Sequence, residues 1–266
     1  MSDLKLHITR PDQQLRWRRK PGDRSGFAGP IRERLCAIYE SILFPHYKMR
    51  NFRHHDNIAL FPELGVVYNR IKKSGNSTIT AFLAELSGHT FASSVEVKLS
   101  TRRPYVFDPV SALRFRALKS VSFVRDPYAR VLSAFRDKVG RGREQFQKYP
   151  GWDEDTPEGF TCFVGFLERG GLYADRHWWP QTELLYKPAD SFDFIGRIEH
   201  LADDMACFLE QIGLQSIHAQ SLSRPHRVSE HQTQSSDALD VFYTEALKAR
   251  VARLYARDFE AFKYPV

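Results

Sequence analysis

Short apolar runs, each leading through a polar loop into a longer amphipathic stretch, dominate the pattern along this chain. Residues 65–68 (Gly-Val-Val-Tyr) form a β-branched and aromatic run that is typical of a buried strand. The polar segment 69–78 follows, and the sequence ITAFLAEL after it has a helical composition that ends at Gly88. This stretch therefore predicts a strand, a glycine-containing loop and a helix in series.

A second unit of the same kind follows further along the chain. It has a strand at 121–124, a sharp turn at 125–127 and a helix at 128–139. Asp126 is placed to cap that helix, and Pro127 suits its first position. Two strand–loop–helix units in series predict an α/β fold with a central, mostly parallel sheet flanked by helices.

The remaining pattern extends this α/β domain. It predicts one more strand, at 192–196, and three more helices, at 31–43, 200–212 and 236–257. The aromatic, proline-punctuated region 141–190 predicts a helical insertion over the sheet edge. We therefore expect a basic N-terminal arm at 1–30 and a single domain at 31–266.

Composition narrows the class of protein without identifying a ligand. The chain has 266 residues, 42% of them hydrophobic and 27% charged, which is a globular balance. Lys and Arg number 39 against 32 Asp and Glu, so the net charge is 39 − 32 = +7, which suits any anionic ligand. Three cysteines are too few for a disulfide scaffold, and no apolar run matches a signal peptide or membrane span. These features predict a soluble cytoplasmic protein.

The first polar loop has the features of a phosphate cradle. A helix N-terminus presents unpaired N–H groups and partial positive charge. Gly75 allows close approach of the backbone, Ser77 and Thr78 add hydroxyl donors, and Lys73 adds a full charge. Because the lysine precedes the glycine, the loop is not that of the nucleoside triphosphatases. The alternative is an ordinary turn with solvated lysines.

The second loop offers another anion site. Arg125 ends its strand at the sheet edge where open α/β folds bind ligands. Ser133 lies about two helical turns later, so the two side chains suit a second phosphate. Alternatively, Arg125 is a structural ion-pair residue. Two such sites on neighbouring units predict a nucleotide with phosphates at both ends.

The motifs themselves resemble those of a known family. Residues 68–78 (YNRIKKSGNST) resemble the 5′-phosphosulfate loop of sulfotransferases, including the uronyl 2-O-sulfotransferases. Residues 123–138 (FVRDPYARVLSAFRDK) resemble the 3′-phosphate element of the chondroitin and HNK-1-type carbohydrate sulfotransferases. Segments 160–196 and 255–264 are similar to the same group, and the resemblance covers 62–264. The Golgi members' membrane anchor is missing, which predicts a soluble bacterial relative.

The resemblance implies a fold, a donor and a reaction. The fold is a three-layer α/β fold related to P-loop nucleotide-binding proteins. The donor is 3′-phosphoadenosine 5′-phosphosulfate, which leaves adenosine 3′,5′-bisphosphate after sulfuryl transfer. The expected acceptor is a hydroxyl on a carbohydrate, and the positive charge allows that carbohydrate to be anionic. No metal is required.

The resemblance also assigns roles to residues of this chain. Lys73 matches the catalytic lysine, and Arg125 and Ser133 match the 3′-phosphate site. Arg197 and Arg227 are further candidates for donor binding. The 5′-phosphate falls to the loop that carries Lys73 and continues through Ser74, Gly75, Asn76, Ser77 and Thr78.

The sequence leaves more than one candidate for the general base and for the overall function. His177 is the favoured base because its pKa suits the role, and the flanking Trp178 and Trp179 are candidates to stack on a sugar. Glu96 is the other candidate base. The rival functions are a P-loop-like nucleotide kinase, a nucleic-acid-binding protein that uses the basic residues at 16–24, and an inactive relative.

Overall fold

The part of the chain that the structure describes is built on one four-stranded sheet. The computed structural model describes residues 42–52, 54, 57–88, 109–214 and 235–266. Its strands are β1 (Ile58–Phe61), β2 (Val66–Asn69), β3 (Lys119–Val124) and β4 (Phe194–Arg197), in spatial order β1-β2-β3-β4. All four are short, and β1 and β2 are buried at every position, as expected of strands covered on both faces.

The strand directions place the two predicted loops side by side. β2 pairs with β3 in parallel, with Asn69 opposite Ser122, and β3 pairs in parallel with β4, with Val124 opposite Arg197. The loops after β2 and β3 therefore leave the same edge of the sheet. β1 is antiparallel to β2. The prediction of a mostly parallel α/β sheet is confirmed, although the sequence pattern did not predict β1.

Helices account for most of the remaining described chain. The α-helices are α2 (Met49–Phe52), α3 (Asn76–Leu86), α5 (Pro109–Arg116), α6 (Pro127–Phe135), α7 (Pro157–Glu168), α8 (Gln181–Leu184), α9 (Leu201–Gln211), α10 (Ser235–Phe242), α11 (Glu245–Leu254) and α12 (Ala256–Phe262). Single helical turns occupy Pro62–Leu64, Glu144–Phe146, Gly171–Tyr173, Ala189–Ser191 and Ile198–His200, and a π-helix occupies Arg136–Gly140.

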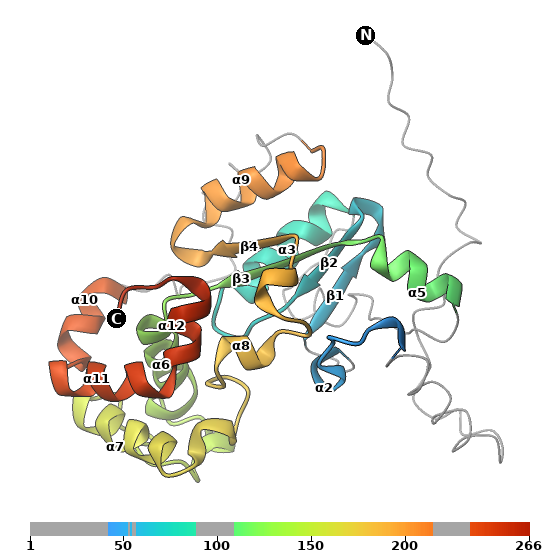
Figure 1. The fold of residues 1–266 in the computed structure, drawn as a ribbon. Coiled ribbons are helices and arrows are strands. Elements are labelled where there is room, and N and C mark those ends of the chain that lie inside the picture. The colour runs from blue at the N-terminus through green and yellow to red at the C-terminus, as the bar shows by residue number, and fades with distance from the viewer. Residues whose placement is uncertain (1–41, 53, 55–56, 89–108, 215–234) are drawn as a thin grey trace.

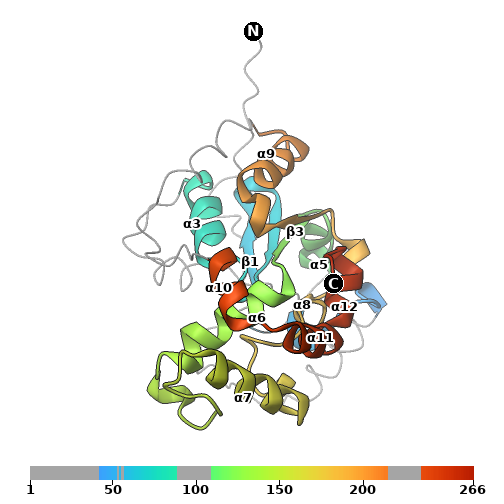
Figure 2. The ribbon, with the colours of Figure 1, turned by 90° about the vertical axis from the view of Figure 1, so that its left-hand side faces the viewer.

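Helices cover both faces of the sheet. Successive side chains along each strand point to opposite faces, so each face contributes to a different core. Ala59, Phe61 and Tyr68 pack with α3 and α9 on one face. Ile58 and Leu60 point to the other face, where they pack with aromatic residues that include Phe52 of α2. Figures 1 and 2 show α9 and α7 at opposite ends of the molecule in both views.

A third core lies at the carboxyl edge of the sheet. It joins α6, α7, α10, α11 and α12, which Figure 1 shows gathered together on one side of the sheet. Ile71, just after β2, and Val124, at the end of β3, belong to this core. These helices therefore pack against the ends of β2 and β3, where the two predicted loops begin.

Two helix predictions need correction. The predicted helix 236–257 has two breaks and spans parts of three helices. Thr244 separates α10 from α11 and caps α11 by accepting from the Leu247 N–H, and Tyr255 separates α11 from α12. The helix predicted at 128–139 is α-helical only to Phe135 and then widens into the π-helix Arg136–Gly140. The predicted helix 31–43 and the arm 1–30 lie outside the described residues, apart from the last two positions of that helix.

Candidate anion-binding site

The first loop has the backbone conformation that a phosphate cradle needs. Gly75 is the N-cap residue of α3 with φ of 64°, and it provides no side-chain cap for that end of the helix. A Cβ at Gly75 would also collide with the Ile198 side chain. The left-handed backbone therefore favours glycine at this position. The N–H groups of the first turn of α3 have no partner within the helix itself.

The neighbouring loop residues differ in burial and in hydrogen bonding. Ser74 is fully buried, and its N–H donates to the Ile71 carbonyl at 3.4 Å. The Asn76 Oδ1 atom accepts from Arg70 and from Thr80, so that side chain braces the loop. Ser77 and Thr78 are half-buried in the first turn of α3.

Lys73 stands at the centre of a cluster of charges. Its φ of 69° is left-handed, an uncommon conformation for a residue with a Cβ, which marks the loop as strained. The Nζ atom lies 2.9 Å from the Asp137 Oδ2 atom. Burial lowers the pKa of Lys73, and the Asp137 carboxylate opposes that shift.

Arg125 connects the second loop to the first. Its Nη1 atom donates to the Lys73 carbonyl oxygen at 3.3 Å. The side chain is half-buried, and burial lowers the pKa of Arg125. The Asp126 side chain caps α6 by accepting from the Ala129 N–H, as the sequence predicted. The two loops are thus in direct contact.

A buried arginine that the sequence analysis did not single out holds a third segment against the first loop. Arg130, 1% exposed, donates from Nε to the Lys72 carbonyl at 3.0 Å and from Nη1 to the Trp179 carbonyl at 2.7 Å. Its Nη2 atom reaches the His177 carbonyl at 3.4 Å. The signal in the sequence was an arginine within the apolar stretch ARVLSAF.

His177 therefore lies beside the first loop and has a carboxylate partner. Its Nδ1 atom is 2.6 Å from the Asp175 Oδ1 atom, which also accepts from the His177 N–H at 2.8 Å. Burial lowers the pKa of His177, outweighing the opposing effect of Asp175. A neutral imidazole bonded through Nδ1–H keeps Nε2 as a proton acceptor.

The prediction that the flanking tryptophans stack on a sugar is wrong. Trp178 is fully buried and donates from Nε1 to the Gly171 carbonyl, and Trp179 is only 7% exposed. The guanidinium groups of Arg50 and Arg176 lie over the Trp179 ring at 4.6 and 4.9 Å. Both indoles are thus parts of the core, where neither offers a face to a ligand.

The remaining residues that were predicted to contact the donor lie in different parts of the structure. Ser133 is half-buried about two turns into α6. Arg136, three residues further along the chain, forms a two-point ion pair with Asp155. Arg197 donates to the Phe262 carbonyl at 2.7 Å and lies over the Tyr264 ring, so it holds the C-terminal segment. Glu96 and Arg227 lie outside the described residues.

Two further findings concern metals and membranes. Among the described residues, no group of three or more His, Cys, Asp or Glu side chains could hold a metal ion. None of the described helices combines the length and the apolar character that crossing a membrane requires.

The geometry thus defines an α/β protein in which two cation-bearing loops meet at one sheet edge. The Sulfotransferase family model matches residues 56–265, which include the sheet and both loops. The chain belongs to the sulfotransferase family.

Several curated proteins are similar to this chain. Zebrafish (Danio rerio) carbohydrate sulfotransferase 14 is 28% identical over 79% of this chain and 62% of its own length. The mouse protein of the same name is 30% identical over 54% of this chain and 42% of its own length. Human carbohydrate sulfotransferase 9 is 25% identical over 85% of this chain and 53% of its own length. The chain therefore spans about half the length of these relatives. No solved structure matches it significantly.

Proposed function

We propose that this protein transfers a sulfuryl group from 3′-phosphoadenosine 5′-phosphosulfate to a hydroxyl group of a carbohydrate. The observation that carries the proposal is the contact between Arg125 and Lys73, which joins two cationic loops at neighbouring strand ends. Membership of the sulfotransferase family supports the reaction class. The names of the relatives, carbohydrate sulfotransferases 14 and 9, support the acceptor class.

The residues present fit a donor with anionic groups at both ends. The first turn of α3, whose N-cap residue Gly75 provides no side-chain cap, and Lys73 suit a 5′-phosphate. Arg125 and Ser133, on the neighbouring unit, suit a 3′-phosphate. When bound, this donor supplies a sulfuryl group that leaves the 5′-phosphate for the acceptor oxygen.

Lys73 then stabilises the negative charge that grows on the departing phosphate. Its side chain is only 18% exposed, so solvent screens its charge little, and the neighbouring Asp137 carboxylate favours the protonated ammonium form. The sulfuryl group carries less charge than a phosphoryl group, so a lysine replaces the metal ion that phosphoryl transfer uses. We expect activity to persist after treatment of the enzyme with a chelator.

His177 removes the proton from the acceptor hydroxyl. Burial keeps its pKa below the ordinary value of 6.5, so the ring is neutral near neutral pH. The Asp175 carboxylate fixes the ring through Nδ1, which directs Nε2 to the proton. The link through Arg130 holds this histidine's main chain beside the Lys72–Lys73 loop.

A labelled-donor screen tests the proposal. The purified chain is incubated with ³⁵S-labelled donor and a panel of neutral and acidic oligosaccharides, peptides and small phenols. We expect label on at least one carbohydrate, and label that forms about 10²–10³-fold more slowly with Lys73→Ala under the same conditions. Label only on peptides or phenols would contradict the carbohydrate assignment, and no transfer to any acceptor would contradict the reaction.

A further inference from the structure

One buried side chain touches both anion-binding loops. Gln181, the first residue of α8, has no solvent exposure. Its Oε1 atom accepts from the Ser74 hydroxyl at 3.1 Å and from the Arg125 N–H at 2.9 Å, while its Nε2 atom donates to the Arg125 carbonyl at 2.8 Å. The amide therefore pairs with the main chain of the second loop and with a side chain of the first.

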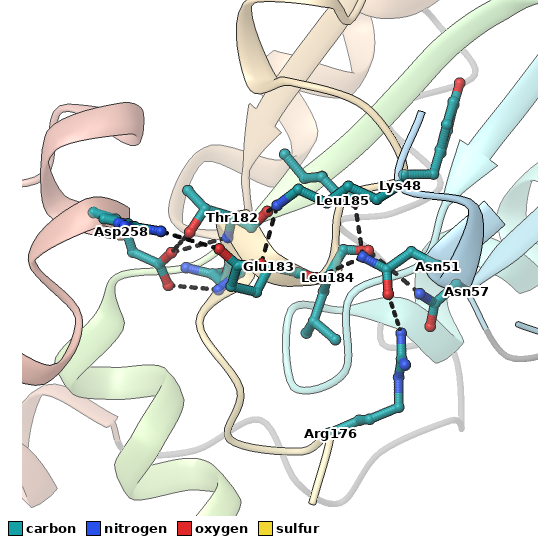
Figure 3. Close-up of polar contacts among 12 residues, drawn as sticks. Lys48, Asn51, Asn57, Arg176, Thr182, Glu183, Leu184, Leu185 and Asp258 are labelled. Atoms are coloured by element: carbon teal, nitrogen blue, oxygen red, sulfur yellow. Dashed lines mark hydrogen bonds and ion pairs between the residues drawn. The ribbon is translucent and has the colours of Figure 1, made fainter. Parts of the chain in front are cut away.

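The helix that carries Gln181 is fixed at its start. Asp258 of α12, fully buried, accepts from the Gln181 N–H at 2.6 Å and from the N–H and hydroxyl of Thr182. Figure 3 shows this carboxylate facing the first residues of α8. The cap leaves the Gln181 backbone little freedom to move.

The other end of α8 is fixed as well. Lys48 donates to the Thr182 carbonyl at 2.9 Å, and the Asn51 amide donates to the Glu183 and Leu185 carbonyls. Figure 3 shows these side chains reaching α8 from the N-terminal part of the described chain. The glutamine is therefore presented to the two loops from a support held at both ends.

We propose that Gln181 is a positioning residue that sets the spacing between the 5′-phosphate and 3′-phosphate loops. This inference rests on the proposed function, because spacing matters only for a ligand that contacts both loops. The glutamine side chain suits this role because its terminal amide carries both an acceptor oxygen and a donor nitrogen. A carboxylate would put an oxygen against the Arg125 carbonyl, and an apolar side chain would leave Ser74 and the Arg125 backbone unpaired.

The test compares a ligand that spans the loops with one that does not. The dissociation constants of adenosine 3′,5′-bisphosphate and of adenosine 5′-monophosphate are measured by calorimetry for the whole chain and for Gln181→Leu. We expect the preference for the bisphosphate over the monophosphate to fall about tenfold in the variant. Gln211→Leu, a matched change at the exposed end of α9, should keep the wild-type preference.

The outcomes separate this inference from the proposed function. An unchanged preference in a folded Gln181→Leu variant would overturn the positioning role. If that variant does not fold, Ser74→Ala removes only the bond to the first loop; we expect a smaller fall in the preference, and an unchanged preference again overturns the role. A wild-type protein with no preference for the bisphosphate would instead overturn the proposed function.

Discussion

The Nζ atom of Lys73 lies 2.9 Å from the Oδ2 atom of Asp137, in a pair whose side chains are only about one-fifth exposed. Asp137 stands in the π-helix that continues α6, and it also contacts Lys138 at 3.1 Å and Arg143 at 2.6 Å. Burial acts to raise the pKa of Asp137, but Lys73 and Lys138 hold it well below its usual range. The charge on Lys73 therefore has a permanently ionised partner.

Replacing Lys73 with alanine tests its role in turnover. We expect turnover to fall by about 10²–10³-fold, because the leaving phosphate loses its cation, while donor binding is partly retained. Alanine also carries a Cβ, so the left-handed backbone at φ of 69° is equally disfavoured in both proteins. The measurement is single-turnover transfer of ³⁵S from the labelled donor. Equal turnover in the two proteins would refute the assignment.

Replacing Asp137 with asparagine tests the ion pair. The pKa of Lys73 is already lowered by burial, and without the Asp137 carboxylate it should fall further. Because Lys73 acts as a cation, activity is lost as pH rises through this pKa. We therefore expect the alkaline limb of kcat/KM for the donor to move to lower pH.

Asp240→Asn, on the exposed side of α10, is the matched control for that change and should leave the limb in place. An alkaline limb at the same pH in Asp137→Asn and wild type would show that the carboxylate does not support the charge of Lys73.

Replacing Arg125 with alanine tests the second phosphate contact. A charge-assisted hydrogen bond contributes about 1.5–3 kcal/mol, so the affinity for adenosine 3′,5′-bisphosphate should fall by about 10–100-fold. Titration calorimetry measures this change. Arg250→Ala, which removes the ion pair with Glu168 on α7, should bind the nucleotide as the wild type does. Equal affinities for Arg125→Ala and wild type would contradict the contact.

The pH dependence of the acidic limb tests His177. The base must be neutral, so activity should be lost as pH falls through a pKa below 6.5. Since Asp175 raises this pKa, Asp175→Asn should move the limb to still lower pH. His177→Gln should abolish the limb and slow the reaction by about 10²–10⁴-fold. A limb that survives in His177→Gln belongs to another group, and Glu96 is then the candidate.

Local sequence predicted the parts of the site that lie within one strand–loop–helix unit. Gly75 and Asp126 took the predicted places, since backbone conformation and capping depend on neighbours in the chain. The periodic apolar stripe at 236–257 did not reveal its breaks, because Thr244 is as compatible with a helix surface as with a cap.

Contacts between distant segments were not predictable in the same way. Gln181 lies 107 residues from Ser74, and nothing in its own surroundings in the sequence marks it as a loop partner. Trp178 and Trp179 looked suited to a sugar because aromatic residues serve both cores and binding sites. Burial decided between those two uses, and burial depends on the whole fold.

The most direct test of the account is the nucleotide preference of the wild-type protein. Adenosine 3′,5′-bisphosphate and ATP are titrated separately into the same preparation, and the dissociation constants are compared. Two joined cationic loops predict that the bisphosphate binds at least about tenfold more tightly than ATP. Tighter binding of ATP would contradict the account and favour a nucleotide kinase.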